Sequence, residues 1–266
     1  MRIRTLDAAK KATPRQSRMT KPIIVLTNDD GYFAPGISAA YHAVRDLGRV
    51  VVVAPRSERS ACSHTITLRR PISVERFTHD EFGPMFIVEG TPADCVRLAY
   101  AELIEGDIGL VVSGINAGAN SGVDVFYSGT IAGAREAAIL RIPAIALSQS
   151  LRAGVELDWQ ATRKAARVVV DHLLQKKLPG PGFWSVNLPA PIPEDPQNHI
   201  HRVPVATHSM PMKFERAEHE GGRLMEFAYG ASYWLREETA PSDYAVIRDG
   251  GIAISAIPLA AAFPND

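Results

Sequence analysis

Two adjacent carboxylates follow the first apolar run of the chain. Asp29 and Asp30 stand in the tetrapeptide Asn-Asp-Asp-Gly directly after residues 23–27, and Ser60 and Asn116 follow two later apolar runs. Carboxylate, amide and hydroxyl oxygens are hard ligands, which suit magnesium or manganese better than zinc or copper. Open α/β sheets bind ligands beyond the carboxyl ends of their strands. These residues therefore indicate an acidic metal site at the ends of several strands.

A polar turn is the alternative interpretation of Asn-Asp-Asp-Gly, because these residue types favour turns for conformational reasons alone. Turn chemistry does not require Ser60 and Asn116 at the ends of other strands. Their coincidence favours the metal site.

A candidate anion site is the tetrapeptide Tyr-Ser-Gly-Thr at 127–130, which directly precedes a helical run at 131–140. Unpaired backbone N–H groups and the helix dipole both favour a phosphate at a helix start. The alternative is that Ser128 is an ordinary helix cap. The glycine-rich segment 114–122 would let the backbone approach a ligand closely, but by itself it is weak evidence.

Several familiar catalytic patterns are absent. The sequence has no G-x-x-x-x-G-K-[ST] phosphate loop, no G-x-G-x-x-G after the first strand and no G-x-S-x-G elbow. His64 lies near Ser60 and is a candidate general acid or phosphate contact, although a lone loop histidine more often has a structural role. Cys62 and Cys95 have no neighbouring base and are interpreted as small buried hydrophobes.

From residue 22 onward, short apolar runs alternate with amphipathic stretches, which is typical of a parallel sheet wrapped by helices. Residues 91–94, Thr-Pro-Ala-Asp, combine a capping hydroxyl, a proline and an acid at the spacing of a helix start. Strands are expected at 23–27, 50–54, 108–113, 143–148 and 184–188, and further helices at 37–47, 130–140 and 159–175.

Four prolines between 189 and 196 then break regular structure, and residues 227–234 and 245–257 are expected to be strands of a separate β-rich extension. The predicted fold is α/β with a mainly parallel sheet. We expect a basic disordered tail at 1–21, a catalytic core at 22–190 and the extension at 191–266.

The composition limits the class of partner. The 266 residues are 46% hydrophobic, and 29 Lys and Arg balance 29 Asp and Glu, so no net field draws the chain to a nucleic-acid duplex or a membrane surface. No apolar run reaches the roughly 18 residues of a membrane span. Two cysteines form no disulfide framework and indicate a reduced, cytoplasmic compartment.

The first 21 residues carry seven Lys and Arg against the single acid Asp7 and lack an apolar signal segment. Two interpretations stay open. The segment is a solvated tail, with Met19 as the possible true start before the first strand, or it is an organelle-targeting segment, which is typically rich in Arg and poor in acids.

A set of ordered motifs resembles the survival protein SurE family of 5'-nucleotidases. The motifs are 25–32, 34–37, 53–55, 59–60, 67–68, 90–96, 112–120 and 127–130. The resemblance implies a Rossmann-like three-layer core, one magnesium or manganese ion per subunit, hydrolysis of nucleoside 5'- and sometimes 3'-monophosphates, and homodimers or homotetramers.

Carried over motif by motif, the resemblance implies Asp29, Asp30, Ser60 and Asn116 as metal ligands. It implies Asn120, Ser128, Gly129 and Thr130 as phosphate contacts. The segment 260–263 lacks the polar residues expected there, which concerns the quaternary contacts rather than the chemistry.

The expected reaction is metal-assisted hydrolysis of a phosphomonoester, with Asp29 and Asp30 as catalytic residues. Asp29 is the candidate to orient or deprotonate the attacking water. An aspartate nucleophile that forms a phospho-aspartyl intermediate is the alternative within this class. A nucleotide-sensing module that binds without turnover is the alternative from another class.

Overall fold

The computed structural model describes residues 21–178, 180–209, 211–217, 225–230, 232–236 and 241–259. The expected tail lies outside these residues except for Lys21, as do Met19 and the segment 260–263. Within the described residues, no helix is long and apolar enough to cross a membrane.

A nine-stranded sheet forms the centre of the fold, in the order β3-β4-β2-β1-β5-β6-β7-β11-β8. Its strands are β1 Ile23–Thr27, β2 Arg49–Pro55, β3 Val74–His79, β4 Gly83–Val88, β5 Ile108–Ala117, β6 Ala144–Gln149, β7 Gly182–Leu188, β8 Ile200–Arg202 and β11 Ile252–Pro258. Only the pairs β3–β4 and β7–β11 are antiparallel. The sheet is therefore mainly parallel, as predicted.

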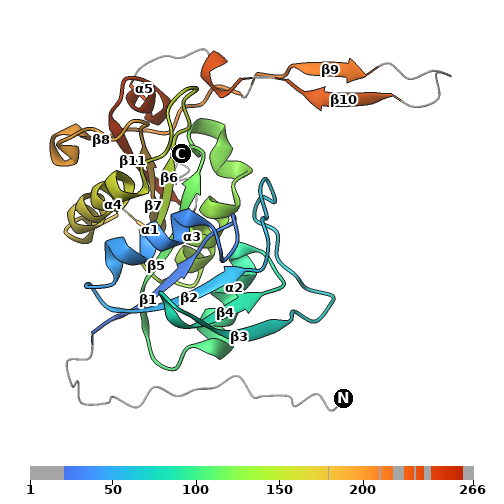
Figure 1. Ribbon diagram of the computed structural model, residues 1–266, viewed down its shortest axis with the longest axis vertical. Helices are drawn as coiled ribbons and strands as arrows, with labels where there is room; N and C mark the ends of the chain where they lie inside the picture. The colour runs from blue at the N-terminus through green and yellow to red at the C-terminus, as the bar shows by residue number, and fades with distance from the viewer. Residues whose placement is uncertain are drawn as a thin grey trace, which may run out of the picture.

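Helices cover both faces of this sheet and make three layers (Figure 1). Helices α1 (Pro35–Val44) and α4 (Trp159–Leu174) pack with the side chains of one apolar cluster. Helices α2 (Pro92–Leu98) and α3 (Gly129–Ile139) pack with those of the other cluster. β1 and its partners are buried on both faces, which explains their continuous apolar runs.

The predicted start of α2 is present in full. The Thr91 side chain accepts from the Asp94 backbone N–H, and the Asp94 side chain accepts from the Thr91 backbone N–H. This reciprocal capping satisfies two N–H groups that a helix start leaves unpaired. Asp94 also accepts from the backbone and hydroxyl of Thr67, so the cap holds the long connection between β2 and β3.

The prediction of one strand over 245–257 was wrong. The segment forms helix α5 (Asp243–Arg248) and then β11, which pairs with β7 in the main sheet. Ser242 caps the helix by accepting from Ala245 N–H, and this local start outweighs the strand propensity of Val246 and Ile247. Gly250, at a φ of +84°, allows the turn into β11.

A two-stranded antiparallel hairpin of β9 (Phe214–Ala217) and β10 (Glu226–Tyr229) extends away from the main sheet (Figure 1). The strand expected over 227–234 is thus shorter, and a 3₁₀ turn at Tyr233–Leu235 follows it. The division of the chain into a core that ends at residue 190 and a separate extension stays a prediction. Strands β8 and β11 lie after it in the chain and still belong to the main sheet.

Candidate active site

A cavity of about 260 Å³ lies beyond the carboxyl ends of β1, β2 and β5. The chain first adds strands on one side of β1 and then, from β5 on, on the other side, so the strand order reverses between β1 and β5. Open α/β sheets bind ligands at such a switch point. The residues that line the cavity are Asp29, Asp30, Glu58, Ser60, Ala61, Asn116, Ala117, Asn120, Asp124, Tyr127 and Ser128. All four predicted metal ligands line this cavity, as do Asn120 and Ser128.

Asp29 is the most enclosed carboxylate of the site, with 4% of its surface exposed. The Thr130 hydroxyl donates to its Oδ1, and Gly129 lies so close that an added Cβ would stand 2.8 Å from the Asp29 Cβ. Burial raises the pKa of Asp29 to about 6, against the lowering effect of the Thr130 hydrogen bond. Gly129 and Thr130 thus lie behind Asp29, and the phosphate contact expected of them stays a prediction.

Asp30 lies beside Asn116 and Ala117, at the end of β5. The Ala117 backbone N–H donates to Asp30 Oδ2 over 3.4 Å. Burial raises the pKa of Asp30, and the Ala117 hydrogen bond opposes that rise. Asn116 donates its amide to the Gly118 carbonyl over 2.7 Å, which orients its side chain at the cavity.

The connection after β2 places Ser60 and Glu58 at the cavity. The Arg59 N–H donates to the Asp29 carbonyl over 2.7 Å, and the Ser60 hydroxyl donates to Glu58 over 2.6 Å. Ala61 and Ser63 have φ angles of +53° and +52°, an uncommon conformation for residues with a side chain. The surrounding contacts therefore fix the shape of this segment.

His64 does not line the cavity. Its Nε2 is 2.7 Å from Glu136 on α3, and Arg97 on α2 donates to the other oxygen of Glu136 over 2.9 Å. Burial acts to raise the pKa of Glu136, but the hydrogen bonds of His64 and Arg97 outweigh it and the pKa is lowered. In this geometry His64 anchors the segment that carries Ser60. This is the structural role that sequence analysis gave as the alternative to a general acid or a phosphate contact.

The segment between β5 and α3 supplies the remaining wall. Ser128 caps α3 by accepting from Ile131 N–H over 3.0 Å. Asn120 donates its amide to the Ser148 hydroxyl over 2.8 Å and its backbone N–H to Asn187 over 2.8 Å. The amide of Asn120 keeps a second hydrogen for a ligand.

The ionisable side chains that line the cavity are acidic, apart from Tyr127. Asp29, Asp30, Glu58 and Asp124 line it, whereas no Lys, Arg or His of the described chain does. Burial raises the pKa of Asp124, and the hydrogen bonds and the charge of Arg236 oppose the rise. An anionic ligand therefore needs a cation to enter.

The donor set fits magnesium or manganese. Across the part of the chain that the structure describes, no three His, Cys, Asp or Glu side chains gather closely enough to hold a metal ion. A metal ion here would depend on Asp29 and Asp30 together with the neutral oxygens of Ser60 and Asn116. Two carboxylates with neutral oxygens and waters suit a hard divalent cation.

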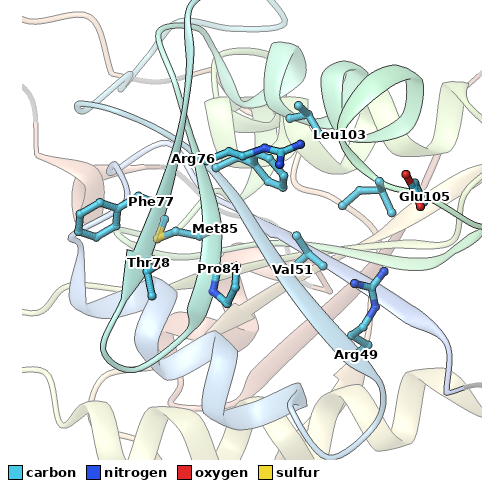
Figure 2. A pocket seen from close by; sticks show the side chains of 11 residues that line it. Arg49, Val51, Arg76, Phe77, Thr78, Pro84, Met85, Leu103 and Glu105 are labelled. Carbon is cyan, nitrogen blue, oxygen red and sulfur yellow. The ribbon is translucent and has the colours of Figure 1, made fainter.

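A larger cavity of about 550 Å³ lies at the opposite end of the strands, where Arg49 begins β2 (Figure 2). Arg76, Phe77 and Met85 line it with Arg49, as does the lone acid Glu105. No pair of carboxylates meets there. Position in the sheet and chemistry therefore both favour the smaller, acidic cavity as the active site.

Glu58 and Asp124 line the cavity without having been predicted as site residues, whereas Tyr127 belongs to the predicted anion site at 127–130. The position of Glu58 beside Ser60 was a usable signal in the sequence. Asp124 had no such signal, because it lies in the 3₁₀ turn Gly122–Phe126, which the sequence pattern does not mark as an element.

Comparison with known proteins identifies the family. The family model "Survival protein SurE" matches residues 24–213. A 5'-nucleotidase SurE from Myxococcus xanthus is 39% identical over 235 residues, which cover 87% of this chain and 86% of the relative. A 5'-nucleotidase SurE from Rhodopirellula baltica is 34% identical over 236 residues, which cover 87% and 90%.

Among solved structures, the crystal structure of the SurE protein from Aquifex aeolicus aligns with a TM-score of 0.75 and 33% identity, covering 90% of this chain and 94% of that chain. The region that the family model matches contains Asp29 and Asp30 after β1, the segment after β2, and the start of α3. The chain therefore belongs to the survival protein SurE family.

Proposed function

We propose that this protein is a divalent-metal-dependent phosphohydrolase that removes phosphate from nucleoside 5'-monophosphates. The names of the relatives, 5'-nucleotidase SurE, support the substrate class. The observation that carries the metal dependence is the cavity lined by Asp29, Asp30 and Glu58, whose charges no lining Lys, Arg or His of the described residues balances. A phosphate dianion would be repelled from such a cavity unless a cation first balanced its charge.

Asp29, Asp30, Ser60 and Asn116 would hold one magnesium or manganese ion. Such an ion, when bound, supplies positive charge to the phosphoryl oxygens and lowers the pKa of a coordinated water. Thr130 donates to Oδ1 of Asp29, and Oδ2 lies beside Gly129 at the start of α3. Asp29 lines the cavity, where it would orient or deprotonate the attacking water. An aspartate nucleophile stays the alternative, and single-turnover hydrolysis in labelled water separates the two.

Asn120 and Ser128 would contact the phosphate. Both line the cavity, and Ser128 stands at the start of α3, where the helix dipole favours an anion. Hydrolysis of 3'-monophosphates and a cytoplasmic location extend the proposal, and the two free cysteines are compatible with a reducing compartment.

A second copy of this chain is the proposed partner of the β9–β10 hairpin. The hairpin exposes large apolar side chains to a degree unusual for a monomer: Met212, Phe214, Met225, Phe227 and Tyr229 are between 46% and 86% exposed. Covering them in a homodimer or homotetramer would remove this apolar surface from water.

Phosphate release from a panel of nucleoside 5'- and 3'-monophosphates tests the function, with magnesium, with manganese and with a chelator. Release that requires the metal supports the proposal. Binding of a nucleotide without release would favour the sensing module instead. Asp80→Asn is the matched control for substitutions in the site, because Asp80 is an exposed acid in the turn between β3 and β4.

A further inference from the structure

An arginine from the C-terminal segment holds one wall of the candidate active site. Arg236 donates through Nη2 to both carboxylate oxygens of Asp124, over 2.7 and 2.8 Å, and through Nη1 to the Ser121 carbonyl over 3.1 Å. The Arg236 side chain is 3% exposed and that of Asp124 is 12% exposed. This is a buried ion pair between residues far apart in the chain, and one guanidinium nitrogen contacts both carboxylate oxygens.

Further contacts fix Arg236 in place. Its guanidinium lies 4.4 Å from the centre of the Tyr233 ring, and the Tyr233 hydroxyl is hydrogen-bonded to the Ser121 hydroxyl. Trp234 donates its indole N–H to the Leu151 carbonyl over 3.0 Å. The segment 232–236 is thus docked on the 3₁₀ turn that carries Asp124, and it directly follows the β9–β10 hairpin in the chain.

The position of Asp124 gives this pair an electrostatic consequence. Asp124 lines the same cavity as Asp29, Asp30 and Glu58. A carboxylate on this wall opposes an anionic substrate and attracts a cation, and a bound arginine cancels both effects. Buried charges interact strongly because little water screens them.

We propose that Arg236 is a positioning residue that neutralises Asp124 and so sets the affinity of the cavity for phosphate. This inference rests on the proposed phosphohydrolase function. The C-terminal segment then affects substrate binding through the charge of Arg236, which acts on Asp124 and does not contact the substrate.

The proposal predicts opposite shifts for the two ligands of the site. In Arg236→Met, Asp124 is left uncompensated, so the KM for a nucleoside monophosphate and the inhibition constant of inorganic phosphate rise on the order of tenfold. The Mn²⁺ affinity of the same variant rises, because the cavity is more negative. If Arg236 had a merely structural role, Arg236→Met would weaken the binding of both phosphate and Mn²⁺.

Three further variants complete the test on the full chain. Arg236→Lys keeps the charge and is expected to stay within about threefold of the parent in KM. Asp124→Asn combined with Arg236→Met removes both charges and is expected to restore both affinities. Arg152→Met is the matched control, because Arg152 packs on Trp234, with its Cζ 5.8 Å from the ring centre, and does not line the cavity.

A parental KM in Arg236→Met, or a double variant as impaired as the single one, overturns the proposal. If Arg236→Met fails to fold, Asp124→Asn decides: a lower KM with weaker Mn²⁺ binding supports the charge role, and an unchanged or raised KM overturns it. A parent that releases no phosphate would end the proposed function. The Mn²⁺ titrations of the same variants still test the charge role in that case.

Discussion

The Asp29→Asn substitution separates a strained metal site from a polar turn, because the two interpretations differ even without metal. Burial raises the pKa of Asp29 from 3.8 to about 6. That difference is about two pKa units, and each unit corresponds to about 1.4 kcal/mol. The ionised carboxylate therefore destabilises the metal-free fold by about 3 kcal/mol at neutral pH.

The sign of the pH dependence follows from the raised pKa. Between pH 3.8 and about 6 the folded protein holds a proton on Asp29 that the unfolded chain has released, so stability falls as pH rises through this window. Above it the loss is complete. Asn keeps the shape and can still accept from Thr130, so the metal-free variant is expected to lack this loss and to melt about 5–10 °C higher than the parent at pH 7.5.

Thermal melts in chelator between pH 4 and pH 8 measure this difference, with Asp80→Asn as the control for loss of an exposed acid. The gap between variant and parent is expected to grow as pH rises toward 6. Adding Mn²⁺ should stabilise the parent more than the variant, because the parent keeps both carboxylates. A variant that melts lower than the parent at every pH without metal would refute the reasoning.

Three other predictions concern packing and assembly. Gly129→Ala is expected to abolish most activity, because the new Cβ would stand 2.8 Å from the Asp29 Cβ; parental activity would contradict the geometry. A chain that begins at Met19 should keep the melting temperature and activity of the full chain, and a large loss of either would show that the tail packs on the fold. Light scattering should find a dimer or tetramer at micromolar concentration, and Phe227→Asp should shift it toward monomer because Phe227 is 55% exposed on the hairpin. A monomeric parent would contradict the proposed assembly.

The sequence was sufficient wherever a local pattern carried the information. β1 matched its predicted bounds because its five residues are all buried and the first four are apolar. The Thr91 capping box predicted the start of α2 because its residues lie within one helical turn of each other in the sequence. The four predicted metal ligands came together because the carboxyl ends of parallel strands meet at one edge of a sheet.

Contacts between distant segments were beyond the reach of such patterns. Arg236 and Asp124 are 112 residues apart, and nothing in either local sequence marks the pair. His64 and Glu136 are 72 residues apart, so the sequence left the role of His64 open. The helix at 243–248 was missed because its cap, Ser242, competes with a run of residues that favour strands.

Turnover of Asp29→Asn and Asp30→Asn under saturating Mn²⁺ tests the central claim most directly. Both carboxylates line the acidic cavity, and each substitution removes one negative charge that a metal ion needs. The metal-site account predicts that phosphate release falls on the order of a hundredfold in each variant, while Asp80→Asn stays at the parental rate. Near-parental turnover in both variants would contradict it.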